Sequence, residues 1–96
     1  LAVMHNNRGY HQELMHVQRM ADRHMRGLDR AHIGTTLRDP YIDYAKIAQG
    51  MGIEAIGPIN DPKDLAPALK RAIESGLPAV IDVPIHPDFH AAVVSK

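Results

Sequence analysis

The chain has 96 residues, of which 45% are hydrophobic, and its eleven basic residues balance its eleven acidic ones. A chain of this length forms one small domain at most and buries only about 60–65% of its extended-chain surface. Balanced charge excludes the basic footprint of a nucleic-acid-binding protein and argues against an anionic membrane surface as a partner. The chain contains no cysteine, which excludes disulfides, thiolate metal sites and a cysteine nucleophile.

The sequence also gives no sign of a membrane segment or a targeting segment. No apolar run reaches the roughly 18–20 residues of a membrane-spanning helix, and the first residues lack the pattern of a signal peptide. We therefore expect neither a nucleic acid nor a membrane among the partners. The lack of cysteine is compatible with a cytoplasmic location, which we take as the expectation.

The first half of the chain predicts a strand, a helix and a loop. The apolar run of residues 1–4 predicts a short strand over residues 1–5. Apolar side chains at three- and four-residue spacing predict a helix from about residue 10 to residue 25, with one face formed by Leu14, Val17, Ala21 and Met25. Residues 27–40 show no periodicity and predict a loop. Four methionines are expected to fill the core: Met15, Met20, Met25 and Met51.

Two aspartate–proline pairs predict helix starts in the second half of the chain. Asp39, followed by a proline, is expected to cap a helix over residues 41–51, and Asp61 is expected to cap the next one. Gly76 is expected to end that second helix. Its apolar positions follow helical spacing and predict one buried face, made of Leu65, Ala68, Leu69, Ala72 and Ile73.

Short strands are predicted at residues 53–56 and 79–83, and the second of these is rich in β-branched residues. The alternation of strands and helices predicts an α/β fold with a mostly parallel sheet. Three strands make a narrow sheet, and few helices are present to cover its two faces. We therefore expect the chain to be part of a larger domain, beginning inside a fold.

Two adjacent carboxamides, Asn6 and Asn7, follow the first strand, and Gly9 and Tyr10 then lead into the helix. A strand end that leads into a helix lies at the carboxyl edge of a parallel sheet, where α/β folds place their ligands. The free N–H groups and the dipole of the helix favour a phosphate there. Carboxamide and carbonyl oxygens are also ligands of Mg²⁺. The alternative is a simple turn with an asparagine cap, and the local pattern by itself favours that alternative.

Residues 2–86 resemble the second half of the cofactor-binding C-terminal domain of thiamine diphosphate-dependent enzymes of the acetolactate synthase, benzoylformate decarboxylase and pyruvate decarboxylase group. The family's motif starts with Gly-Asp-Gly and ends with Asn-Asn at a strand end, and residues 3–10 contain that ending. Residues 43–53 are similar to the family's helix with its small-residue and glycine ending. Residues 64–83 look like its last helix and strand.

The resemblance implies part of a three-layer αβα sandwich, the thiamine diphosphate-binding fold, over residues 1–86, with residues 87–96 as a tail. It implies that Asn7 coordinates Mg²⁺ through its side-chain oxygen and Gly9 through its backbone carbonyl, so that both anchor the diphosphate. Asn6 and Tyr10 would shape this loop. The first half of the motif with its aspartate, and the glutamate that activates the cofactor, are missing from this chain. We therefore expect the isolated chain to be inactive.

Glu13 is the candidate for catalysis. Some decarboxylases of the family have a glutamate at about this position, whereas synthases often have an apolar residue there. The alternative is a surface glutamate near a helix N-terminus, where the helix dipole favours a negative charge.

Two further features of the sequence were considered as possible sites. The histidines do not favour a metal site, because Pro87 separates His86 from His90, and His11 and His16 do not share a helix face. The segment containing Gly34, Thr35 and Thr36 is either a substrate-side loop or an ordinary connector.

The resemblance implies an enzyme, a lyase or a transferase, that depends on thiamine diphosphate and Mg²⁺ and acts on 2-keto acids or related carbonyls. It also implies the remaining domains of the same enzyme as partners, in a homodimer or homotetramer. The alternative function is a stand-alone, non-catalytic interaction or scaffold module of α/β type. The sequence does not distinguish a decarboxylase from a synthase, because the substrate pocket comes largely from absent segments.

Overall fold

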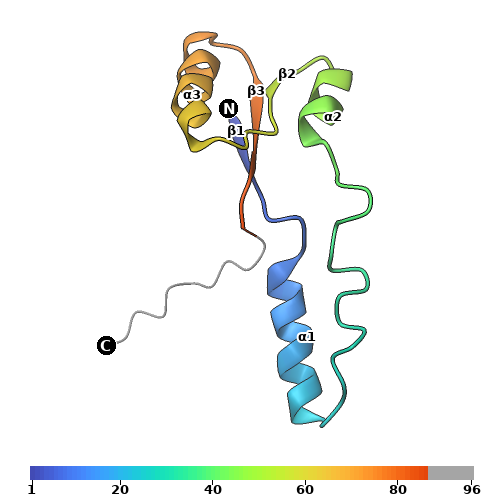
Figure 1. Cartoon of the computed structure of the whole chain (residues 1–96). Helices are drawn as coiled ribbons and strands as arrows, with labels where there is room; N and C mark the ends of the chain where they lie inside the picture. The colour runs from blue at the N-terminus through green and yellow to red at the C-terminus, as the bar shows by residue number, and fades with distance from the viewer. Residues whose placement is uncertain (87–96) are drawn as a thin grey trace, which may run out of the picture. The chain divides into compact units, whose positions relative to one another are not determined.

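The computed structural model describes residues 1–86 and divides them into two compact units (Figure 1). The sheet unit contains residues 1–6 and 43–85. The helix unit contains residues 7–42 and continues at residue 86. The expected tail, residues 87–96, lies outside the described residues.

The sheet unit is built on a three-stranded sheet in the order β1-β3-β2, with β1 at Ala2–Asn6, β2 at Glu54–Ile56 and β3 at Ala79–Pro84. Both strand pairs are parallel, so the prediction of a mostly parallel sheet is confirmed. The bounds of each strand agree with the predicted bounds to within one residue. β3, the strand richest in β-branched residues, is the central one.

Two helices lie on opposite sides of these strands, α2 at Tyr44–Gly50 and α3 at Leu65–Glu74 (Figure 1). Ala68 and Ala72 of α3 pack against Ala79 and Ile81 of β3 and form the main core. On α2, Ala45 and Ala48 are buried. The small alanine side chains let each helix backbone approach the strands closely. The prediction of an α/β fold is confirmed.

The predicted start of α2 is wrong. Asp39 adopts a left-handed φ of 55°, whereas a capping residue needs an extended backbone. The cap is Asp43, whose Oδ1 accepts the backbone N–H of Lys46 at 2.9 Å. The helix therefore begins three residues later than predicted. The other cap is confirmed, because the Asp61 carboxylate accepts the N–H of Lys63 at 3.0 Å at the start of a 3₁₀ turn, η1 at Pro62–Asp64, that leads into α3.

The predicted end of α3 is confirmed, and one residue of its predicted face is wrong. Gly76 adopts a φ of 65° just after the helix, a conformation that favours glycine. Ile73 was expected in the core but is 67% exposed. Ala68 and Ala72 form the face of α3 that packs against β3. Ile73 is the next residue after Ala72 and points about 100° away from it around the helix axis, so the sheet does not cover it.

The helix unit contains α1 at His11–Arg23, which ends before the predicted residue 25 because Met25 adopts a left-handed φ of 50°. None of the α1 residues is buried. The expectation that the methionines fill a core is wrong, since Met25 is 95% exposed and Met51 is 76% exposed. For Met25 the physical reason is that the described part of the helix unit contains no second helix or sheet to cover α1. Met51 lies in the sheet unit, at the exposed end of α2.

A membrane-spanning helix is not found in the described residues, since every helix there is too short or too polar to cross a bilayer.

Candidate functional site

The loop between β1 and α1 is a tight turn closed by a side chain. The Asn7 Oδ1 atom accepts the backbone N–H of Gly9 at 3.2 Å. Arg8, between them, adopts a left-handed φ of 58°. This is the turn that asparagine side chains commonly form with backbone two residues on. The N-cap of α1 is Tyr10, which makes no side-chain capping bond, so the asparagines do not cap this helix.

A second strand of backbone runs against this loop. Gly9 pairs with Thr36 in an antiparallel bridge. The Tyr10 N–H donates to the Thr35 carbonyl at 2.7 Å, and the Leu37 N–H donates to the Arg8 carbonyl at 2.9 Å. In such a pair, the N–H and C=O of Gly9 itself point away from the opposing strand. Because Asn7 meets the Gly9 N–H on that outer side, the Asn7 Oδ1 atom and the Gly9 carbonyl share one side of the loop.

The close approach of the two backbone strands requires a glycine at position 9. A Cβ atom there would lie 2.9 Å from the Thr35 carbonyl oxygen, which is closer than real Cβ contacts. The glycine therefore allows Thr35 to hold the loop against the start of α1.

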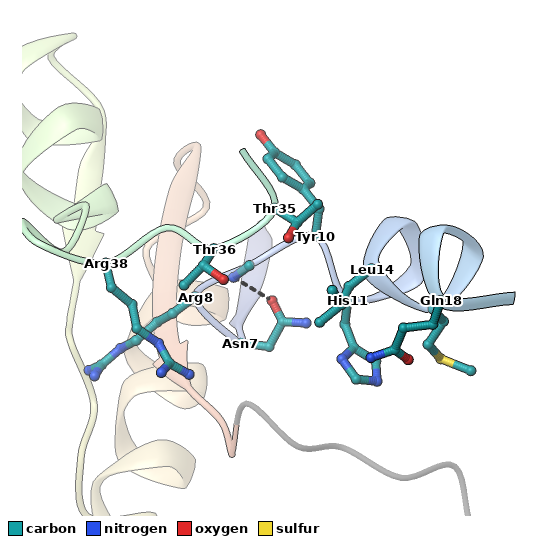
Figure 2. Close-up of a pocket in the computed structure, with 11 residues that line it drawn as sticks. Asn7, Arg8, Tyr10, His11, Leu14, Gln18, Thr35, Thr36 and Arg38 are labelled. Carbon is teal, nitrogen blue, oxygen red and sulfur yellow. Dashed lines mark hydrogen bonds between the residues drawn. The ribbon is translucent and has the colours of Figure 1, made fainter. Parts of the chain in front are cut away.

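A pocket of about 380 Å³ lies at this loop (Figure 2). Its wall combines the loop itself, one face of the first two turns of α1 and part of the segment that crosses Gly9. The lining residues are Asn7, Arg8, Gly9, Tyr10, His11, Leu14, Met15, Gln18, Thr35, Thr36 and Arg38.

The N-terminus of α1 is part of this pocket. His11, Leu14 and Gln18 are spaced so that they lie on one helix face, and all three line the pocket. The first N–H groups of a helix have no partner within the helix, and here no side chain caps them. Such groups, together with the helix dipole, favour a bound anion.

The structure brings together the two residues that the sequence analysis proposed as metal ligands, Asn7 and Gly9, and Tyr10, which was proposed to shape the loop. Asn6 is the buried last residue of β1, its carbonyl accepts the Ile85 N–H at 3.0 Å, and it is not among the pocket residues. Its role in shaping the loop stays a prediction.

The catalytic candidate, Glu13, is exposed and does not line the pocket. It lies two positions after His11 on α1, about 200° around the helix axis from it. Glu13 therefore projects from the opposite side of α1 from the pocket face. Its catalytic role stays a prediction, and any reaction at Glu13 would take place on that other side.

Two features of the pocket were missed by sequence reasoning. The Arg8 guanidinium carbon lies 3.8 Å from the centroid of the Tyr41 ring. The segment with Thr35 and Thr36, for which a substrate-side role was one of two alternatives, lies directly against Gly9. No local pattern reveals either contact, because the partners are far apart in the sequence and meet only through the bridge.

The histidines do not form a metal site within residues 1–86, where no three His, Asp or Glu side chains lie close enough together to hold an ion. His90, one member of the pair considered from the sequence, lies outside the described residues.

The pocket fits the diphosphate end of a metal-bound cofactor. Asn7 and Gly9 offer two oxygens on one side of the loop, and a hard cation such as Mg²⁺ takes its further oxygens from phosphate and water. The glycine allows the close approach of the Thr35 backbone, which forms part of the pocket wall. The uncapped N–H groups of α1 suit phosphate oxygens.

The comparison with protein families agrees with this geometry. Residues 1–83 match the family model of the thiamine pyrophosphate enzyme C-terminal TPP binding domain, thiamine pyrophosphate (TPP) being another name for thiamine diphosphate. Searches of curated proteins and of solved structures gave no match. The family match covers both strand-to-helix loops, all of β1 and β2, and β3 up to its last residue. The chain therefore belongs to the thiamine pyrophosphate enzymes, as part of their C-terminal TPP-binding domain.

Proposed function

We propose that this chain holds the Mg-diphosphate end of thiamine diphosphate in an enzyme that acts on 2-keto acids or related carbonyls. The enzyme would be a lyase or a transferase, similar to a decarboxylase or to acetolactate synthase. The observation that supports the proposal most is the turn in which the Asn7 Oδ1 atom accepts the Gly9 N–H, with the Gly9 carbonyl on the same side of the loop.

Each residue of the turn has a distinct task in this proposal. An amide oxygen has two lone pairs, so Asn7 accepts the Gly9 N–H with one and offers the other to Mg²⁺. Gly9 offers its backbone carbonyl as a second ligand. The first N–H groups of α1 bind phosphate oxygens. Tyr10 fixes the start of the helix through its 2.7 Å hydrogen bond to Thr35.

When bound, thiamine diphosphate supplies the electron sink for cleaving or joining a carbon–carbon bond. The residues of this chain bind and orient its diphosphate, which positions the reacting end of the cofactor against the rest of the enzyme. The proposal includes the remaining domains of the same enzyme as partners, a homodimer or homotetramer, and a cytoplasmic location.

Titration calorimetry of the whole protein with thiamine diphosphate tests the proposal, with Mg²⁺ present and after its removal by a chelator. We expect removal of Mg²⁺ to weaken binding strongly. Asn7→Ala should weaken Mg-dependent binding by at least the roughly 10–100-fold that loss of an outer-shell metal partner costs. Asn7→Asp keeps an oxygen that accepts the Gly9 N–H and ligates Mg²⁺, so it should retain most of the affinity.

The matched control is Asn60→Ala, because Asn60 is an exposed asparagine in the sheet unit whose side chain donates to the Pro58 carbonyl at 3.5 Å. This variant should bind the cofactor as the unmodified protein does. Equal affinity of Asn7→Ala and Asn60→Ala would overturn the proposed metal site. A folded protein that binds no thiamine diphosphate at all would favour the scaffold function instead.

A further inference from the structure

One side of helix α1 is left uncovered by the described part of the helix unit. His11, Leu14 and Gln18, which are half-buried, face the pocket beside the loop (Figure 2). Around the helix from them, Val17 is 41% exposed and Met20 is 38% exposed. An amphipathic helix buries its apolar stripe against a neighbouring element. The exposed side of α1 therefore presents apolar surface that a second molecule can cover.

Four residues on this exposed side form a continuous seam, made of Glu13, Val17, Met20 and His24. Their spacing of four, three and four residues places them within about 60° of one another around the helix axis. The same spacing defines the stripe along which two helices pack side by side in a coiled coil. The two central residues of the seam are apolar. Glu13 lies at its N-terminal end, and His24, the C-cap of α1, lies at its C-terminal end.

A hollow of about 420 Å³ lies along the C-terminal half of the seam. Its lining combines apolar side chains with one arginine and two histidines and contains no carboxylate. The lining residues are His16, Val17, Met20, Ala21, His24, Arg26 and Gly27. None of the ion pairs within residues 1–86 involves Glu13, His24 or Arg26. The hollow therefore complements an apolar side chain that has a carboxylate close by.

The N-terminal half of the same seam has that combination, because Glu13 lies about one helical turn before Val17. A second copy of α1, turned end for end, places its Val17 opposite Met20 and its Glu13 opposite His24. A twofold dimer uses one surface patch twice, so both halves of the seam find their complement in a single contact. We propose that two copies of the chain associate through an antiparallel pairing of their α1 seams. The Glu13 carboxylate of each copy then lies beside His24 and Arg26 of the other copy.

The pairing gives a surface to the homodimer of the proposed function, and to that extent it rests on that function. It gives Glu13 a binding task on the side of α1 opposite the pocket, different from the catalytic task considered from the sequence. The proposed metal site lies at the loop before α1, outside the seam and its hollow. The metal site and the seam can therefore be tested separately.

Disulfide trapping tests the pairing, since the chain has no cysteine of its own. We expect the chain with both Glu13→Cys and His24→Cys, oxidised with diamide, to form a covalent dimer that a reducing agent separates. The two new thiols of one helix lie eleven residues and about 16 Å apart, too far for a disulfide within one copy. In the antiparallel pair, each thiol lies opposite the other thiol of the second copy.

The single variants, Glu13→Cys and His24→Cys, are the controls for orientation. In an antiparallel pair, identical positions at the ends of the seam are about 16 Å apart, so neither single variant should form the covalent dimer. A parallel pairing, or chance collision of exposed thiols, would link the single variants as well. The antiparallel seam is overturned by an absence of covalent dimer in the double variant, or by equal yields in the single variants.

The apolar centre of the seam is tested in the double-cysteine chain. Met20→Lys places two like charges at the centre of the pairing and should reduce the yield of covalent dimer roughly tenfold or more. Gln12→Lys is the matched control, because Gln12 is an exposed residue of the same helix and lines neither the hollow nor the pocket. Its yield should equal that of the parent. Equal yields in these two lysine variants would show that the seam does not hold the pair.

Asn7→Ala separates this result from the proposed function. The change removes a proposed metal ligand that lies outside the seam, so it should leave disulfide trapping unchanged. Trapping without Mg-dependent binding of thiamine diphosphate would overturn only the metal site. Mg-dependent binding without trapping would overturn only the seam.

Discussion

At position 9, two stretches of backbone come closer together than any side chain allows. The Cβ atom of an alanine would lie 2.9 Å from the Thr35 carbonyl oxygen, which belongs to backbone and has little room to move. We expect Gly9→Ala to open the bridge to Thr36 and to destabilise the protein by about 1–3 kcal/mol, as overpacking commonly does. Cofactor affinity should fall with it. Urea unfolding and calorimetry with thiamine diphosphate measure the two effects.

The control for this prediction is Gly50→Ala, at the last residue of α2. Apart from its chain neighbours and the backbone of its own helix, no atom of the described residues lies within 4 Å of the position that its Cβ would take. An alanine there should be neutral or should stabilise the helix by roughly 0.5–1 kcal/mol. If both variants lose the same stability, the close approach of Gly9 and Thr35 does not explain the requirement for glycine.

Among the elements, helix α2 begins where the side chain of Asp43 caps it. The Lys46 backbone N–H, bonded to the Asp43 carboxylate, lowers the pKa of Asp43 below its usual 3.8, with a further contribution from the Lys46 side chain. A lowered pKa means that the carboxylate stabilises the folded state at pH values above the unfolded pKa. That stability is lost as pH falls through the lower, folded pKa.

We therefore expect Asp43→Ala to lower the melting temperature at neutral pH, because the helix loses its cap. The difference from the unmodified protein should shrink as the pH is brought below 3.8, and thermal unfolding at several pH values measures it. Asp29→Ala is the control, since the Asp29 side chain is 83% exposed and only approaches Arg30 at 4.0 Å. A gap that stays constant down to low pH would contradict the cap mechanism.

The elements also show what a sequence pattern predicts and what it misses. The strands and α3 were predicted because each depends on its own residues, such as the β-branched run of β3 and the alanines of α3. The cap of α2 was misplaced because Asp39 and Asp43 are both suitable residues, and only the backbone conformation decides between them. The apolar face of α1 predicted a helix correctly but not its burial, which depends on neighbours elsewhere.

In the candidate site, too, the local features were predicted from the sequence and the long-range contacts were not. Asn7 and Gly9 were predicted because the turn is local, formed by residues two positions apart. The contact of Arg8 with Tyr41 and that of Gly9 with Thr35 arise from the bridge, and no local pattern contains it. Glu13 was proposed from its place in the chain, and its position on the far side of α1 becomes visible only when the pocket residues are known.

For the molecule as a whole, the two units should respond differently to the cofactor. The pocket residues all belong to the helix unit, whose helix has no buried residue. Weakly buried regions open locally at low free energy, whereas central strands open only with the whole fold. Thiamine diphosphate with Mg²⁺ should therefore slow amide hydrogen exchange at Tyr10 and Leu37, the donors of the bridge, far more than in β3.

Hydrogen exchange followed by mass spectrometry measures this difference. In Asn7→Ala the slowing at Tyr10 and Leu37 should disappear at the same cofactor concentration. An equal slowing in both units would show that the cofactor stabilises the fold globally and not through the bridge.

The position of β3 has a consequence for how the molecule is made. Its register pairs Val80 with Ala2 of β1 and also with Ala55 of β2, so each edge strand has β3 as its partner in the sheet. A ribosome releases residues 2–6 and 54–56 well before residues 79–84, so neither ladder exists until the last strand emerges. Such long-range pairing slows folding relative to local helix formation. We therefore expect the helices, which need only local contacts, to form on the nascent chain before the sheet, and the sheet to close in a single late step around β3.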